Sequence, residues 1–135
     1  MTKIALIGAA SGWGAGFRQA EDGPRGLREF GLAERLTECG VSARWAAMVS
    51  TAKHWRAHPE LGVPETFDLV AQHNAALAQA VAHDVPAKEL PVVLGGDHAI
   101  AIGTWGGVAR RMGGAPFGLV WMDAHLDAHT LATTP

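Results

Sequence analysis

Short apolar runs alternate with longer amphipathic stretches along this chain. Apolar runs followed by turn residues predict buried β-strands at 3–7, within 41–50, at 90–94 and at 117–122. Between them, apolar residues at helical spacing predict helices over 24–40, 64–84 and 98–111. Alternating strands and helices are typical of an α/β fold, in which helices cover both faces of a parallel sheet.

The histidines and apolar residues of the second predicted helix are expected on opposite sides. Its inner side is predicted to hold Phe67, Val70, Ala71, Leu77 and Val81, whereas His73 and His83 are expected at the solvated surface. His54 and His58 lie in an irregular connection at 51–62. They are interpreted as surface histidines, because an isolated pair lacks a third metal ligand.

A glycine-rich loop, residues 8–16, follows the first predicted strand. The backbone there must turn sharply or approach another segment closely. The dinucleotide-binding pattern that starts at Gly12 would need a glycine at position 17, which is Phe17. No Gly-Lys-Ser/Thr follows, so the phosphate-binding loop pattern also fails. Trp13, inside this loop, is expected near a ligand or a subunit contact.

Composition limits the compartment and the partners. At 135 residues the chain is expected to form one domain, and its net charge of −2 does not indicate a nucleic-acid or anionic-membrane partner. A single cysteine, Cys39, excludes an intrachain disulfide and favours a reducing compartment. The apolar N-terminus is interpreted as a first strand rather than a signal peptide, and no other run could span a bilayer. We therefore expect a cytoplasmic protein.

Candidate chemistry lies directly after the last predicted strand, in Asp123-Ala124-His125-Leu126-Asp127. On an extended backbone alternate side chains share a face, so Asp123, His125 and Asp127 would project the same way. Two carboxylates and an imidazole form an oxygen-plus-nitrogen ligand set for a divalent metal. Mn²⁺ suits this set, and Zn²⁺, Fe²⁺, Co²⁺ and Ni²⁺ stay open. The absence of thiolates argues against a structural zinc site.

A second candidate segment, Gly95-Gly96-Asp97-His98, lies where a predicted strand ends and a helix begins. Ligands gather at the carboxyl edge of open α/β sheets. The helix that follows is a crossover, so the strands before the two segments should be parallel and bring His98 toward Asp123. Asp97 is expected to cap the helix or to orient a ligand. The predicted metal ligands are His98, Asp123, His125 and Asp127.

At these residues the chain resembles the ureohydrolase family, which includes arginase, agmatinase and their relatives. The matching segments are Gly95-Gly96-Asp97-His98, Asp123-Ala124-His125-Leu126-Asp127 and the weaker Glu21-Asp22-Gly23-Pro24…Leu27-Arg28. The resemblance implies a three-layer α/β/α fold with a parallel sheet. It also implies a binuclear Mn²⁺ hydrolase, trimeric or hexameric, that releases urea from a guanidino compound. By that resemblance His98 and Asp127 would bind one metal and His125 the other, with Asp123 bridging them.

The chain also departs from the family pattern. The family's metals need a later Asp-x-Asp pair, which does not occur before Pro135. Residues 1–135 are therefore expected to be the N-terminal part of a single ureohydrolase domain, arginase-like and incomplete. His129 stands where arginases place an asparagine that reads the amino-acid end of arginine, and it is the candidate substrate-binding residue. The substrate is left open between L-arginine, which gives ornithine and urea, and an agmatinase or guanidino-acid substrate.

A second hypothesis takes the 135 residues as the complete protein. Half of a binuclear site would bind metal weakly, so the chain would be a truncated, non-catalytic metal-binding subunit or a regulatory partner. Apolar strand edges left exposed would then drive association.

Overall fold

The computed structural model describes residues 3–128, 130 and 132, and a parallel sheet lies at its centre. The sheet contains β1 (Lys3–Ala10), β2 (Ser42–Ser50) and β3 (Glu89–Gly95), in the order β2-β1-β3. The last six residues of β1 are all buried, as expected for a strand covered on both faces. The first three predicted strands are thus confirmed.

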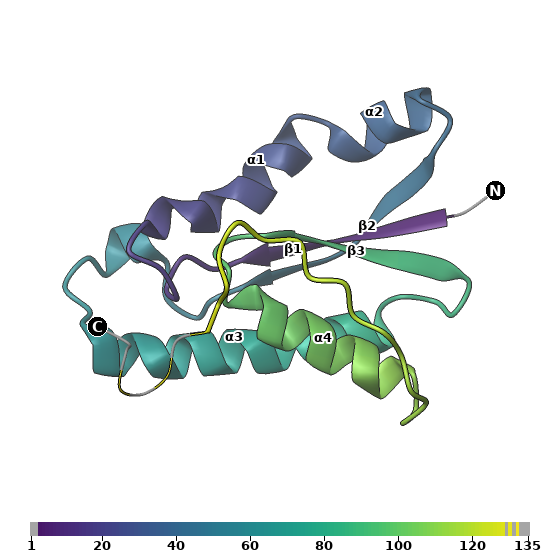
Figure 1. Cartoon of the computed structure of the whole chain (residues 1–135). Coiled ribbons are helices and arrows are strands. Elements are labelled where there is room, and N and C mark those ends of the chain that lie inside the picture. The colour runs from purple at the N-terminus through teal and green to yellow at the C-terminus, as the bar shows by residue number, and fades with distance from the viewer. Residues whose placement is uncertain (1–2, 129, 131, 133–135) are drawn as a thin grey trace.

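Helices cover both faces of the sheet (Figure 1). One face carries α1 (Gly23–Glu29) and α2 (Leu32–Glu38), and the other carries α3 (Val63–His83) and α4 (Ile100–Arg111). Two short 3-10 helices, η1 (Arg18–Asp22) and η2 (Trp55–Ala57), lie in the connections. The predicted three-layer α/β/α architecture is confirmed. Among the described residues, none of the helices has the length and apolar character that crossing a membrane requires.

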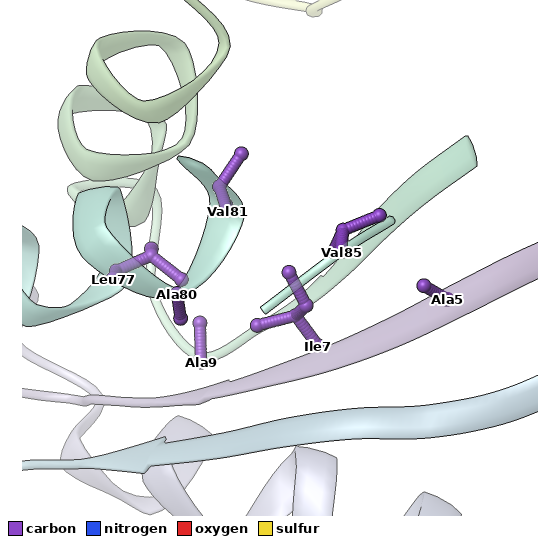
Figure 2. Packing of buried hydrophobic residues seen from close by; sticks show 7 residues of the cluster. All are labelled: Ala5, Ile7, Ala9, Leu77, Ala80, Val81 and Val85. Atoms are coloured by element: carbon purple, nitrogen blue, oxygen red, sulfur yellow. The ribbon is translucent and has the colours of Figure 1, made fainter. Parts of the chain in front are cut away.

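The main hydrophobic core lies between β1 and α3 (Figure 2). Ile7 of β1 and Leu77 and Val81 of α3 have no exposed surface. Full burial of each such side chain stabilises the fold by about 1.5–3 kcal/mol. The complete buried cluster is Ala5, Ile7, Ala9, Leu77, Ala80, Val81 and Val85. This packing holds the carboxyl end of β1 in place next to that of β3.

The predicted helix over 24–40 is two helices in the structure. Pro24 lies in the first turn of α1, as expected, because a first-turn residue needs no backbone N–H donor. Gly31 then adopts a φ of 78°, which belongs to the left-handed region and ends the first helix. The helical stripe of apolar residues continues across this break, which is why the sequence pattern alone did not show it.

The buried side of α3 differs from the prediction. Leu77 and Val81 face the core as expected, but Phe67 is 73% exposed and Ala71 is also exposed. The actual stripe contains Thr66, Leu69, His73, Asn74, Leu77, Ala78, Ala80 and Val81. Because polar residues occupy much of this stripe, the apolar pattern placed its first half on the wrong side.

His73 is buried, so its predicted place at the solvated surface is wrong. It is 2% exposed, and its Nε2 lies 3.2 Å from the carbonyl oxygen of Val49 in β2. Buried polar side chains need a hydrogen-bond partner, and the carboxyl end of β2 provides one. Burial lowers the pKa of His73 below its ordinary value, although the hydrogen bond to Val49 and the nearby Asp97 and Glu21 act in the opposite direction. His83, by contrast, is exposed as predicted.

The predicted strand at 117–122 is not a strand in the structure. Residues 112–128, here called the tail segment, contain no helix or strand and pass across the molecule after α4 (Figure 1). Val120 is 81% and Met122 91% exposed. Within the described part of the chain, β3 pairs with β1 alone, and a strand requires a backbone partner that this segment does not have. Phe117 in this segment stacks its ring on that of Trp105 in α4, at 6.4 Å between centroids.

Candidate metal centre

His98 lies at the carboxyl edge of the sheet, between the end of β3 and the start of α4, as the sequence predicts. The chain reaches this point through Gly96, which passes very close to the end of β1. A Cβ at Gly96 would lie 2.3 Å from the Ser11 carbonyl oxygen and 2.6 Å from that of Ala9. Only glycine permits this approach, so the sequence Gly95-Gly96 fixes where His98 leaves the sheet. The imidazole itself is 56% exposed.

Asp97 fixes the turn that leads into α4. Its side chain is buried, and Oδ1 accepts a hydrogen bond from the Ala99 backbone N–H at 2.9 Å. Oδ2 accepts a second one from the Gly14 N–H at 2.8 Å. The carboxylate therefore has a role close to the predicted helix cap, and it also ties down the glycine-rich loop.

Three predicted ligands converge at this edge of the sheet. His98 Nδ1 lies 3.4 Å from Asp123 Oδ2, and His98 Nε2 lies 3.2 Å from Asp127 Oδ2. One ligand atom from each of the three residues lies within 4.8 Å of the others. His98 and Asp123 line an open cleft of about 540 Å³ whose lining also includes Trp105 and Trp121. The tail segment thus brings its carboxylates to His98 without forming the expected strand.

His125 is not one of the three clustered residues, although its side chain contacts Asp123. Its side chain is 85% exposed, and its Nδ1 lies 3.1 Å from Asp123 Oδ1. The strict alternation of an extended strand is absent because the chain bends at Ala124 and His125 and because Asp127 has a φ of 49°. Metal binding by His125 therefore stays a prediction.

The electrostatics of Asp123 favour its ionised form. The backbone N–H of His125 donates to Oδ1 at 2.8 Å and is the main cause that lowers the pKa of this carboxyl group. The His125 side chain and the nearby His98 lower it further. Asp123 thus offers a carboxylate, rather than a carboxylic acid, to a cation.

Trp121 is a site residue that the sequence motifs did not include. Its indole Nε1 donates to Asp127 Oδ2 at 2.9 Å, and its ring centroid lies 5.3 Å from that of His98. The signal that could have identified it is its position two residues before Asp123, because residues two apart on an extended strand lie on the same face. The candidate substrate residue His129 lies outside the described residues.

Two other expected features have structural roles. Trp13 is 4% exposed and donates its indole N–H to the Lys53 carbonyl oxygen at 2.9 Å, so it packs within the fold. Glu21, in the weaker matching segment, is 1% exposed and accepts hydrogen bonds from the Thr51 hydroxyl at 2.8 Å and the Trp55 N–H at 3.2 Å. Asp22, the next residue of that segment, contacts His54: the distance between Asp22 Oδ1 and His54 Nε2 is 3.1 Å.

A sequence model of the arginase family matches residues 2–135, which is nearly the entire chain. The chain belongs to the arginase family. The ureohydrolase resemblance found in its motifs is therefore confirmed.

Individual members of the arginase family agree with this assignment. The arginase of Bacillus caldovelox is 37% identical over 137 residues, which cover 100% of this chain and 45% of that protein. The arginase of Bacillus subtilis is 34% identical, with 98% of this chain and 43% of the relative covered. This chain thus spans less than half the length of these arginases.

Solved arginase structures share the fold. A crystal structure of the Bacillus subtilis enzyme superimposes with a TM-score of 0.79 at 33% identity, covering 99% of this chain and 42% of that one. The native Bacillus caldovelox structure gives a TM-score of 0.75 at 36% identity, covering 100% and 45%. The α/β class predicted from the sequence is thus shared with arginases.

Proposed function

We propose that residues 1–135 form the N-terminal part of a single arginase-like domain that binds Mn²⁺ through His98, Asp123, His125 and Asp127. One observation carries the proposal. In a chain of the arginase family, an imidazole and two carboxylates from distant segments lie within 4.8 Å of one another. The remaining two ligands, the Asp-x-Asp pair of the family pattern, are proposed to come from outside these residues.

The donor atoms fit this metal. Imidazole nitrogen and carboxylate oxygen suit Mn²⁺ and similar divalent ions, and the three clustered residues include no thiolate. The hydrogen bonds that lower the pKa of Asp123 hold it as an anion. When bound, such a cation lowers the pKa of water and neutralises negative charge that develops on a substrate.

The chain's own residues have distinct parts in this proposal. His98, Asp123, His125 and Asp127 would supply the imidazole nitrogens and carboxylate oxygens that hold the cations. Trp121 orients Asp127 through its indole N–H. The exposed position of His98 leaves the site open to a small polar molecule.

The proposed reaction is hydrolysis of a guanidino compound with release of urea. L-arginine, which gives ornithine, is the first candidate, and an agmatinase or guanidino-acid substrate is the second. His129 is proposed to contact the substrate. Because the chain spans less than half the length of these relatives, the hydrolytic reaction is proposed for a protein that also contains the rest of the domain. That protein is proposed to be a cytoplasmic trimer or hexamer.

A second candidate function is a non-catalytic metal-binding subunit. Large exposed apolar side chains in the tail segment, such as Val120, Met122 and Leu126, favour it because they could contact another chain. Purification of the chain from its native source separates the two. A stable chain of this length without any other arginase-family polypeptide supports the second candidate.

Titration of the chain with Mn²⁺ in a calorimeter tests the proposal. Asp123→Asn and His98→Ala should weaken binding at least about tenfold, because each removes one ligand. Asp68→Asn and His83→Ala make the same chemical changes at exposed positions of α3 and serve as controls. A chain that binds no Mn²⁺, or binds it equally well as Asp123→Asn, would show that the proposal is wrong. Urea release from L-arginine, agmatine and a guanidino acid then tests the substrate class in a longer protein.

A further inference from the structure

Two loops at the carboxyl edge of the sheet are joined through one buried carboxylate. The first is the glycine-rich loop after β1, and the second is the turn after β3 that carries His98. The Asp97 backbone N–H donates to the Ser11 carbonyl oxygen at 2.9 Å, and the Gly14 N–H donates to Asp97 Oδ2 at 2.8 Å. Asp97 is 7% exposed, and both of its oxygens accept from backbone N–H groups. Hydrogen bonds to an ionised acceptor are roughly twice as strong as neutral ones.

The contact between the loops is also tight. A Cβ added at Gly14 would lie 2.7 Å from the Ala99 Cβ and 3.0 Å from Asp97 Oδ1. Gly14 therefore packs against both residues that flank His98. One turn later, Asn74 of α3 accepts a hydrogen bond from the Gly103 N–H of α4 at 2.8 Å in a buried setting. The backbone around His98 is thus held from the loop on one side and from α3 on the other.

The side chain of His98 has no comparable support. It is 56% exposed, and its partners among the described residues are Asp123, Asp127 and Trp121, all in the tail segment. Its position relative to the body of the fold is consequently set by its backbone. Metal sites require ligand atoms to be placed within a few tenths of an ångström, so support of this backbone affects affinity directly.

We propose that Asp97 is a positioning residue for His98, acting through Gly14 and Ala99. It fixes the point at which the imidazole meets the carboxylates of the tail segment. This inference rests on the proposed metal-binding function and extends it to Asp97, Gly14 and Ala99, which would not touch the metal. A purely structural Asp97 would stabilise the fold without any specific effect on His98.

The test compares matched variants of the full chain. Gly14→Ala pushes the loop away from Ala99, whereas Gly16→Ala introduces the same methyl group where nothing lies within 4 Å. Asp97→Asn places an amide N–H₂ against a backbone donor, and Asp68→Asn is its exposed control. Mn²⁺ affinity is measured by calorimetry at a temperature at which circular dichroism shows every variant folded.

Gly14→Ala and Asp97→Asn should each weaken Mn²⁺ binding by about 10–100-fold, the usual effect of losing a group that orients a ligand. Gly16→Ala and Asp68→Asn should stay within about twofold of the parent chain. If Asp97→Asn does not fold, Gly14→Ala decides, because it removes neither a charge nor an acceptor. Equal Mn²⁺ affinity in the parent chain and in Gly14→Ala overturns the positioning role and leaves the proposed function intact.

A metal-free measurement separates the two proposals. The nuclear Overhauser effect between the rings of His98 and Trp121 reports where the imidazole lies. If the parent chain binds no Mn²⁺, the proposed function fails, and this signal alone decides the positioning role. Loss of the signal in Gly14→Ala but not in Gly16→Ala supports it, and an unchanged signal in both overturns it.

Discussion

The carboxylate of Asp97 accepts a hydrogen bond from the backbone N–H of Gly14, 83 positions earlier in the chain, at 2.8 Å. This bond joins the carboxyl end of β1 to that of its neighbour β3. Because both ends lie at the edge where His98 leaves the sheet, this bond between a backbone N–H and a side-chain carboxylate supports the segment that carries the candidate metal centre. The same carboxylate holds the Ala99 N–H, so its removal would affect two segments at once.

Asp97→Ala should therefore lower the free energy of unfolding by about 2–4 kcal/mol, because two N–H groups lose their acceptor. Urea denaturation followed by circular dichroism measures this change. Asp84→Ala, at the exposed end of α3, is the comparison and should have a smaller effect. A loss below about 0.5 kcal/mol for Asp97→Ala would contradict the prediction, since exposed substitutions often reach that size.

Two glycines of α4 should respond in opposite ways to the same substitution. A Cβ at Gly103 would lie 2.6 Å from the Asn74 carbonyl oxygen, whereas at Gly106 the nearest atom, the Ala78 Cβ, would be 3.8 Å away. Gly106→Ala should raise stability by about 0.5–1 kcal/mol through helix propensity. Gly103→Ala should instead destabilise the chain by about 1–3 kcal/mol, because α3 and α4 must separate. Thermal unfolding of both variants gives the comparison, and a gain in both would refute the close packing.

His73 should make stability depend on pH below its ordinary pKa of 6.5. Burial lowers the pKa of the folded-state imidazole, so the unfolded chain binds a proton at a higher pH than the folded chain does. The unfolding free energy is therefore not reduced by His73 above pH 6.5. It decreases as the pH falls below 6.5, by at most about 1.4 kcal/mol per pH unit for one proton.

Comparison of two histidine variants isolates this contribution. His73→Gln should flatten the decrease in unfolding free energy between pH 6.5 and the lowered pKa, whereas His83→Gln, at an exposed position of the same helix, should leave it unchanged. Urea titrations at a series of pH values supply the data. Parallel curves for the parent chain and His73→Gln would mean that His73 does not titrate differently on folding.

Trp121 should report metal binding through its fluorescence. Its indole N–H holds Asp127, and its ring lies beside His98, so a paramagnetic ion bound there would quench its emission. Trp121→Phe should abolish most of the quenching by Mn²⁺ and weaken the affinity several-fold, because Asp127 loses its orienting donor. Trp45→Phe, in the middle of β2, is the control. Quenching of equal size in Trp121→Phe would place the ion elsewhere.

The tail segment should exchange its amide protons fast in the metal-free chain. Residues 117–128 have no helical or strand hydrogen bonds, and several of their side chains are exposed, whereas β1 is buried and paired on both sides. Addition of Mn²⁺ should slow exchange around Asp123 and Asp127 while leaving β1 unchanged. Exchange in the tail segment that is already slow without metal would contradict this prediction.

Local patterns in the sequence predicted much of the fold and the positions of some of the candidate site residues. A strand followed by Gly95-Gly96 and a helix placed His98 and Asp97 correctly, because the end of a strand and the start of a helix are determined by neighbouring residues. The placement of these two residues uses short-range geometry, which a sequence records directly. His98 also meets Asp123 as predicted, but the parallel strand at 117–122 that was expected to bring them together does not form.

The incorrect predictions concern contacts between segments that are distant along the chain, which local sequence patterns do not specify. The apolar run at 117–122 indicates burial, but whether it becomes a strand depends on an available edge, and β3 does not pair with it. His73 can be buried because the Val49 carbonyl oxygen, from a distant part of the chain, provides a hydrogen-bond partner for its imidazole. The predicted alternation of Asp123, His125 and Asp127 is interrupted by the bend at Ala124 and His125 and by the left-handed φ of Asp127.

Two of the three clustered candidate ligands, Asp123 and Asp127, belong to a segment that is part of neither the sheet nor its covering helices, while His98 lies between β3 and α4. An ion at this position would close a loop between them, and closing a loop reduces the entropy of the chain. The apparent affinity for metal would therefore combine coordination strength with the cost of ordering the tail segment. Any partner or further chain that ordered residues 117–128 in advance would tighten metal binding without touching the ion.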